Sequence, residues 1–184
     1  MNRVKIRNWL VLAHLFMASA LAPAFLLVAV TGAMDLAGIE AELVETELVM
    51  PAGVKIDPAS TTIEKEVEAV LAANGIAADF ESLRVRPELI TTRPTSRDFV
   101  RIEKTDGRWT ATLNQPDLQY SMMELHKGHG PAAFKIYQII AGIALFLVIC
   151  GGLMVGLMAK SYRSKTGAAF VLGAATFGAL AFAT

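Results

Sequence analysis

Three histidines are the side chains of this sequence best suited to chemistry. His14 lies inside a long apolar segment, and an ionisable side chain in such a place is a candidate functional residue by default. Its plainer interpretation is a neutral imidazole hydrogen-bonded to another helix. His126 and His129 are three residues apart, and on a helix this spacing puts both on one face, where they could share a metal or present one haem ligand. The plainer interpretation of this pair is a polar junction, because Gly128 and Gly130 surround it.

Arginines form a second group of candidate residues. Arg84 and Arg86 point to the same side of a predicted strand, and Arg101 lies on another strand. Together they could bind an anionic ligand such as a ferric chelate or a lipid headgroup. Such a row of arginines is more often a solvated face whose positive charge is balanced by nearby carboxylates. The carboxylates expected to do so are those of Glu81, Glu88 and Glu103.

The acidic residues divide the chain into apolar and water-soluble parts. All 17 lie between Asp35 and Glu124. A charge at the bilayer centre costs roughly 2.5 to 3.5 kcal/mol, so segments without carboxylates are suited to lipid. We therefore expect membrane helices at 9–34, 135–159 and 167–184, with one extramembrane domain at 35–134. The last helix is the weakest prediction, because it is short and rich in glycine and alanine; the alternative is a helix lying on the membrane.

Basic residues flank the predicted spans and predict their orientation. They occupy the first eight residues and the loop at 160–166, and they are Arg3, Lys5, Arg7, Lys160, Arg163 and Lys165. Short basic flanks remain in the cytoplasm. The domain at 35–134 is then extracytoplasmic, and we expect it on the periplasmic side of a bacterial inner membrane. An exported domain and a formal net charge of zero exclude nucleic acid as a partner.

The pattern of the central domain predicts an α+β module in which one helix packs on a short antiparallel sheet. The helix begins near Thr61, with Glu64 at capping-box spacing, and ends at Gly75. Strands are predicted at 80–85, 99–104 and 108–114, the last two joined by Thr105-Asp106-Gly107. Residues 41–50 are either extended or continue the first span. The predicted buried residues are Ile63, Val67, Val70, Leu71, Val100, Ile102, Trp109, Ala111 and Leu113.

Several short motifs resemble those of the PepSY-associated transmembrane family. They are His14 followed by Val30-Thr31-Gly32 in the first span, and Leu125-His126-Lys127-Gly128 before the second. The resemblance covers nearly the whole chain and implies a PepSY-like domain between the spans. Larger members imply a haem-b reductase of ferric siderophores, with His14, His126 and His129 as candidate haem or metal ligands. PepSY modules of some propeptides imply instead a regulator or inhibitor of an extracytoplasmic peptidase.

Helix length limits a haem site within one chain. About twenty helical residues, roughly 30 Å, separate His14 from the outer end of its span. Two histidines on one iron lie much closer than this, so His14 and His126 cannot share a haem. A second ligand for His14 would have to come from another copy of the chain or from a partner subunit.

Small residues in the spans predict close helix packing. Gly152 and Gly156 form a Gly-x-x-x-Gly motif that lets another helix approach closely. No nucleophile–base pair, phosphate-binding loop or pair of catalytic carboxylates stands out. We therefore expect a non-catalytic accessory subunit of a larger membrane complex, respiratory or iron-linked, that contacts lipids and a membrane protein partner or a second copy. The haem-b reductase and the peptidase regulator are the alternatives.

Overall fold

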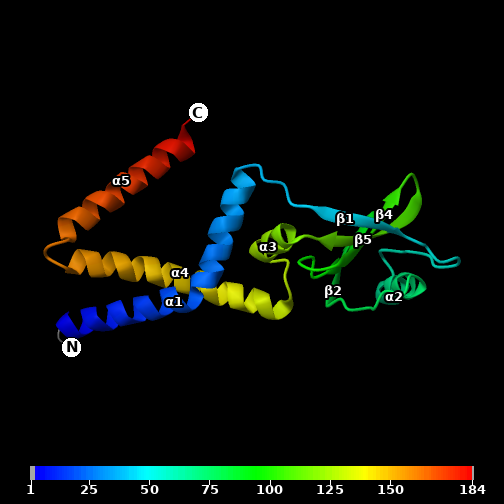
Figure 1. Cartoon of the computed structure of the whole chain (residues 1–184), viewed down its shortest axis with the longest axis horizontal. Coiled ribbons are helices and arrows are strands. Elements are labelled where there is room, and N and C mark those ends of the chain that lie inside the picture. Colours follow the sequence, from blue (N-terminus) through cyan, green and yellow to red (C-terminus); the bar gives the residue numbers. More distant parts are fainter. Residues whose placement is uncertain (1–2, 184) are drawn as a thin grey trace. The chain divides into compact units, whose positions relative to one another are not determined.

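Three helices dominate the chain (Figure 1). The computed structural model describes residues 3–183, and within them α1 (Arg3–Leu36), α4 (Ala132–Met158) and α5 (Arg163–Phe182) are long and apolar enough to cross a membrane. All three predicted spans are thus helices, and each helix begins before its apolar segment does. The length and composition of these helices are those of a membrane protein with a sheet domain between its first two spans.

The chain divides into two compact units. Leu26–Gln138 form one, which holds the sheet, the last turns of α1 and the first turns of α4. The rest of α1, the rest of α4 and the whole of α5 form the other. The sheet domain therefore folds as one body with the helix ends from which it emerges.

The sheet has five antiparallel strands in the order β1-β5-β4-β3-β2. Their bounds are Leu43–Leu48 for β1, Ser82–Arg86 for β2, Leu89–Arg93 for β3, Phe99–Thr105 for β4 and Arg108–Pro116 for β5. The predicted hairpin is confirmed, because Asp106 and Gly107 both have positive φ (51° and 79°) between β4 and β5. Two such residues form the turn whose twist matches that of a hairpin. The extended alternative for residues 41–50 is also confirmed, whereas β3 was not predicted.

One face of the sheet packs against α2 (Ile63–Ala73). The apolar stripe of this helix follows the helical repeat, and Val67 and Val70 are completely buried. The strands contribute every second residue to the same core, as their pleat requires. The buried core consists of Ile56, Val67, Val70, Leu71, Ile90, Val100, Ile102 and Ala111. Of the other predicted core residues, Ile63, Trp109 and Leu113 are partly buried against it.

The predicted capping box of α2 is wrong. The helix begins at Ile63, so Thr62 rather than Thr61 is its N-cap, and Thr62 makes no side-chain capping bond. Its hydroxyl donates instead to the carboxylate of Glu66, at 3.1 Å. The shift of one residue removes Thr61 and Glu64 from the positions at which a capping box can form.

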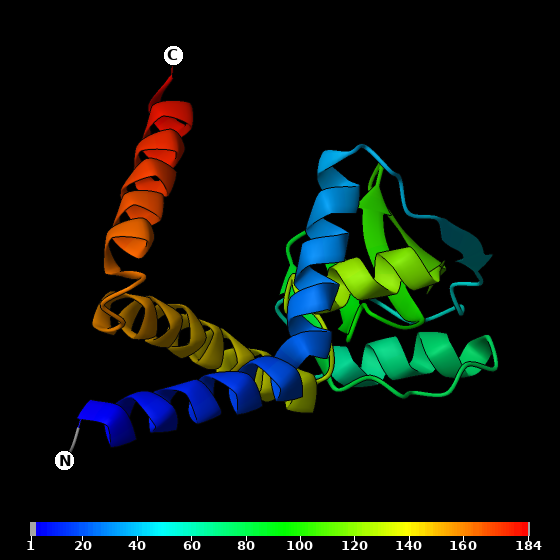
Figure 2. The ribbon, with the colours of Figure 1, turned by 60° about the vertical axis from the view of Figure 1, so that its left-hand side comes forward.

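The opposite face of the sheet carries a second short helix, α3 (Leu118–His126), which the sequence did not predict. The ring of Tyr120 stacks on Phe99, with 6.3 Å between centroids. Phe99 precedes the core residue Val100 on β4, so its side chain points away from α2. Helix α3 lies beside the last turns of α1 (Figure 2). The two helices α2 and α3 thus cover different faces of one sheet.

Candidate functional site

Helix α3 is fixed at its first turn by Asp117. The carboxylate accepts a hydrogen bond from the N–H of Tyr120 at 2.6 Å, as an N-cap does, and another from the N–H of Glu42 at 3.0 Å. These backbone hydrogen bonds lower the pKa of Asp117 below its usual value. Because Glu42 directly precedes β1, one carboxylate sets the start of α3 against the edge of the sheet.

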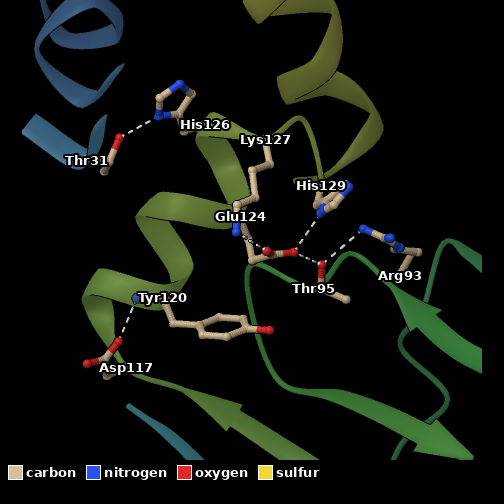
Figure 3. Close-up of polar contacts among 9 residues, drawn as sticks. All are labelled: Thr31, Arg93, Thr95, Asp117, Tyr120, Glu124, His126, Lys127 and His129. Carbon is tan, nitrogen blue, oxygen red and sulfur yellow. Dashed lines mark hydrogen bonds and ion pairs between the residues drawn. The ribbon is translucent and has the colours of Figure 1, made fainter. Parts of the chain in front are cut away.

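The last residue of α3 contacts the first span. Nδ1 of His126 lies 2.7 Å from the hydroxyl of Thr31, and Thr31 is only 1% exposed (Figure 3). The Thr31 hydroxyl also lies 2.6 Å from the carbonyl of Leu27, which can only accept. Since a hydroxyl has one hydrogen, it donates to Leu27 and accepts from His126. The Nδ1 atom of His126 therefore carries a proton.

A buried carboxylate lies at the centre of the junction between α3 and the sheet. Glu124 is 7% exposed, and its Oε2 accepts hydrogen bonds from the Thr95 hydroxyl at 2.5 Å and from Nδ1 of His129 at 2.8 Å (Figure 3). Its Oε1 lies 3.7 Å from the ammonium of Lys127. Arg93 completes the chain of contacts by donating to Thr95 at 3.1 Å. The cluster joins α3, the β3–β4 connection and the segment before α4.

The protonation state of Glu124 follows from these contacts. Burial raises its pKa, but hydrogen bonds from Thr95 and His129, together with the charges of His129 and Lys127, outweigh that effect and leave the pKa below its usual value. Glu124 is therefore a carboxylate at neutral pH and can only accept. His129 must then donate through Nδ1, as His126 does.

The two histidines of this junction do not share a helix face. Helix α3 ends at His126, and Gly128 turns the chain with a φ of 78° before His129. His126 points to Thr31, whereas His129 points to Glu124 (Figure 3). Among the described residues, no three histidine, cysteine or acidic side chains come together as a metal site.

Further hydrogen bonds link the sheet domain to the second span. The first N–H of α4, at Ala132, donates to the carboxylate of Glu81 at 2.8 Å. Six residues further along α4, the amide of Gln138 donates to the carbonyl of Leu125 at 2.5 Å. Gly130 leaves room for the side chain of Leu125, because a Cβ there would lie 2.6 Å from it. The domain is thus bonded to the ends of both spans.

A cleft of about 410 Å³ opens between the end of α1, the loop that follows it and α3. Its lining is mixed: Met34, Ile39 and Met123 are apolar, whereas Glu124 and Lys127 are charged. Thr31 also lines it, so the cleft adjoins both the Thr31–His126 contact and the buried carboxylate. Polar groups of this junction therefore border a space open to small molecules.

His14 lies in the other unit and contacts a neighbouring helix. Its Nδ1 lies 3.1 Å from the carbonyl of Val148, so this nitrogen donates and Nε2 remains without a proton when the ring is neutral. A Cβ on Gly152 would lie 3.3 Å from the ring, so the glycine gives the imidazole its place against α4. One turn on, a Cβ on Gly156 would lie 2.6 Å from the hydroxyl of Thr166 on α5. Both glycines of the predicted packing motif thus meet helices of this same chain.

The three candidate arginines lie on the α3 side of the sheet. Arg84 pairs with Thr91, and Thr91 pairs with Arg101, so the two arginines flank a threonine in one row across β2, β3 and β4. Arg86 lies two residues from Arg84 on the same side of β2. The structure therefore gathers these three residues on one face of the sheet.

The carboxylates expected near these arginines form no ion pairs with them within residues 3–183. In residues 3–183, the ion pairs join Arg97 to Asp79 and Lys127 and His129 to Glu124, and Arg84, Arg86 and Arg101 have none. Glu81 instead accepts from the N–H of Ala132. Arg84 and Arg86 are exposed, as expected of a solvated face, whereas within the described residues no ion pair joins the three arginines to Glu81, Glu88 or Glu103.

Sequence reasoning missed the two central residues of the junction. Glu124 gave a usable signal, since it is the last acidic residue before the second span and lies close to two histidines. Thr95 gave none, because it is distant in sequence and only the fold brings its hydroxyl to Glu124. Comparisons with protein-family models, curated proteins and solved structures give no match to this chain. Its function is therefore inferred from the geometry of these sites.

Proposed function

We propose that the chain is a non-catalytic, membrane-anchored accessory subunit of a larger membrane complex. The sheet domain, with a PepSY-like fold, lies outside the cytoplasm and presents a surface held in a defined orientation to a partner subunit. The basic flanks of the first span and of the loop at 160–166 support this orientation. The partner complex is respiratory or iron-linked, in line with the resemblance of the spans.

The observation that carries this proposal is that the polar groups of the junction are used to fix the domain to the spans. His126 bonds to Thr31 of α1, Glu81 to the start of α4, and Gln138 of α4 to the end of α3. A catalytic side chain has to face its substrate. The hydrogen bonds of His126, Glu81 and Gln138 instead join elements of the protein to one another. Rigid attachment is what a subunit needs to hold a partner in register with the membrane.

The spans offer surface for such a partner. Within the described residues, α5 has no buried side chain, and a Cβ at Gly173 or Gly178 would meet nothing within 4 Å. Small residues with open space above them allow another helix to approach closely in lipid. We therefore place the partner contact on α5.

Isolation of the full chain from its native membrane in mild detergent tests the proposal. A partner should co-purify in fixed stoichiometry, and Gly173→Leu with Gly178→Leu should release it. Because both positions face open space, these changes should leave the unfolding temperature of the isolated chain unchanged. A lone, fully folded monomer that turns over a substrate would refute the proposal.

One observation favours haem binding as a second candidate function. Nδ1 of His14 donates to the backbone carbonyl of Val148, which is the arrangement that orients a histidine to ligate a metal through Nε2. The described residues of that unit contain no second histidine, so a six-coordinate haem b would take its other ligand from another copy or a partner. The protein purified from haem-replete cells should then show a Soret band that His14→Ala abolishes and His129→Ala leaves intact. Absence of the band in the wild type excludes this candidate.

A further inference from the structure

Arg101 is a half-buried arginine whose donors the protein does not use. Within residues 3–183 its guanidinium donates to no protein group, and its Nε is fully buried without a hydrogen-bond partner. Leaving a buried polar group unpaired costs about 1 to 3 kcal/mol, and more for a charged one. Arg93, by contrast, donates to Thr95. Arg101 is therefore not held in place as a structural arginine would be.

Arginines and carboxylates both lie around Arg101, with Glu47 in its row beyond Thr112 and Glu103 two residues along β4, but no ion pair joins Arg101 to either within residues 3–183. Arg84 lies two strands away in the same row, at a Cα separation of roughly 10 Å, which two arginine side chains can bridge to reach one small anion. Arg86 and Arg93 lie on the same side of β2 and β3. Burial lowers the pKa of Arg93, and the charges of Arg84 and Arg86 lower it further, which indicates that these like charges repel one another.

Other polar side chains lie on the same face, and the unsatisfied Oδ1 of Asn114 among them is an acceptor that contributes nothing to binding an anion. Asn114 is completely buried, and its Oδ1 has no hydrogen-bond partner. Asn114 on β5 pairs with Phe99 on β4, so it lies on the side of the sheet that α3 covers. Arg101 follows Phe99 by two residues on the same side of β4. Thr91 and Thr112 pair with Arg101 on its two sides and place hydroxyl groups in the row. The face thus combines unpaired cations with hydroxyl donors.

This combination fits a tetrahedral oxyanion. Guanidinium groups bind phosphate oxygens through two parallel N–H donors, and such charge-assisted bonds are about twice as strong as neutral ones. A phosphate also carries enough charge to relieve the repulsion between several arginines. We propose that the α3 side of the sheet is a phosphate-binding site in which Arg84 and Arg101 grip one phosphate group on either side of Thr91.

Two sources could supply such a group. Helix α3 lies on this face and bonds to Thr31 of α1, so phospholipid headgroups are one source. A free phosphate or soluble phosphate ester is the other. Both present the same oxygens to the arginines, and the test must therefore separate them.

The test measures binding by the full chain in a maltoside detergent, which carries no phosphate group. Equilibrium dialysis with labelled inorganic phosphate measures the free anion, and native mass spectrometry after mixing with phosphatidylglycerol and phosphatidylcholine measures lipid retention. Arg84→Gln with Arg101→Gln should weaken binding at least about tenfold. The matched control, Lys65→Gln with Lys104→Gln, removes the same charge from exposed positions, since Lys104 lies on β4 but on the side of Val100 and Ile102.

Each outcome decides the proposal. Loss of phosphate binding alone identifies a soluble phosphate as the source, and loss of phosphatidylglycerol retention alone identifies a headgroup. Loss of both supports a site that accepts either. Wild-type protein that binds neither, or an arginine variant that binds as well as the lysine control, overturns the proposal. The unfolding temperature of both variants, measured beside the wild type, separates lost binding from lost folding.

Discussion

The hydroxyl of Thr31 and Nδ1 of His126 lie 2.7 Å apart, although 95 residues separate them in the chain. This contact joins the last turns of the first span to the end of α3, which itself packs on the sheet. A buried hydroxyl therefore helps to fix the domain against the end of the first span.

Thr31→Val removes that hydroxyl at nearly constant volume. His126 loses the acceptor for its Nδ1 proton, so we expect the free energy of unfolding to fall by about 1 to 3 kcal/mol. Urea unfolding of the full chain in mild detergent measures the change. The control is Thr105→Val at an exposed strand end, which should change stability by no more than about 0.5 kcal/mol. Equal effects of the two substitutions would contradict the structural role of Thr31.

Glu124→Gln tests the buried carboxylate through pH. The pKa of Glu124 in the folded protein is below the usual value of 4.5, so its contribution to stability is present above that pH and is lost as pH falls through the folded pKa. At neutral pH the variant should be less stable by about 1 to 3 kcal/mol, because the neutral amide loses the charge that strengthens the bonds from Thr95 and His129 and that pairs with Lys127. Below about pH 4.5 the difference should shrink.

Unfolding midpoints across this pH range provide the measurement. Glu68→Gln, at an exposed position of α2, is the control and should follow the wild type at every pH. A Glu124→Gln variant that is destabilised equally at pH 7 and pH 3 would show that charge is not what Glu124 contributes.

Gly156→Ala tests the packing of α4 against α5. The added Cβ would lie 2.6 Å from the hydroxyl and 2.8 Å from the methyl group of Thr166, so we expect a loss of about 1 to 3 kcal/mol. Gly142→Ala in the same helix meets nothing within 4 Å and should be neutral or slightly stabilising. Thermal unfolding in detergent compares them. Adding Thr166→Ala to Gly156→Ala should restore stability, and failure to do so would disprove the steric explanation.

Ile102→Val and Ile102→Ala test the core between α2 and the sheet. Ile102 is 1% exposed, so we expect losses of about 0.5 to 1.5 and 2 to 5 kcal/mol respectively. Val85→Ala, on the exposed edge strand β2, should cost far less. Urea unfolding gives the free energy of unfolding of all three variants. If Ile102→Ala does not fold, the loss measured for Ile102→Val still tests the core.

The elements predicted from sequence are those with strong local signals. The spans follow from uninterrupted apolar segments, α2 from the spacing of Val67, Val70 and Leu71, and the β4–β5 hairpin from Asp106-Gly107. Helix α3 was missed because it is short and its stability comes from Asp117 and from the stacking of Tyr120 on Phe99, contacts that only the fold creates.

The candidate site shows the same division. The histidines were identified because ionisable residues are rare in or beside membrane spans. Their partners were not, since Val148, Thr31 and Glu124 reach them only through tertiary packing. The arginine row across three strands likewise depends on the register of β3, a strand that the sequence pattern did not predict.

The central claim is that the sheet domain lies on one side of the membrane and the α4–α5 loop on the other. Labelling with a membrane-impermeant maleimide tests it, in a chain whose single cysteine is first removed by Cys150→Ser. A cysteine introduced by Glu68→Cys should react from outside intact spheroplasts, whereas one introduced by Ser164→Cys should react only after lysis. Reaction of both from the same side would contradict the account.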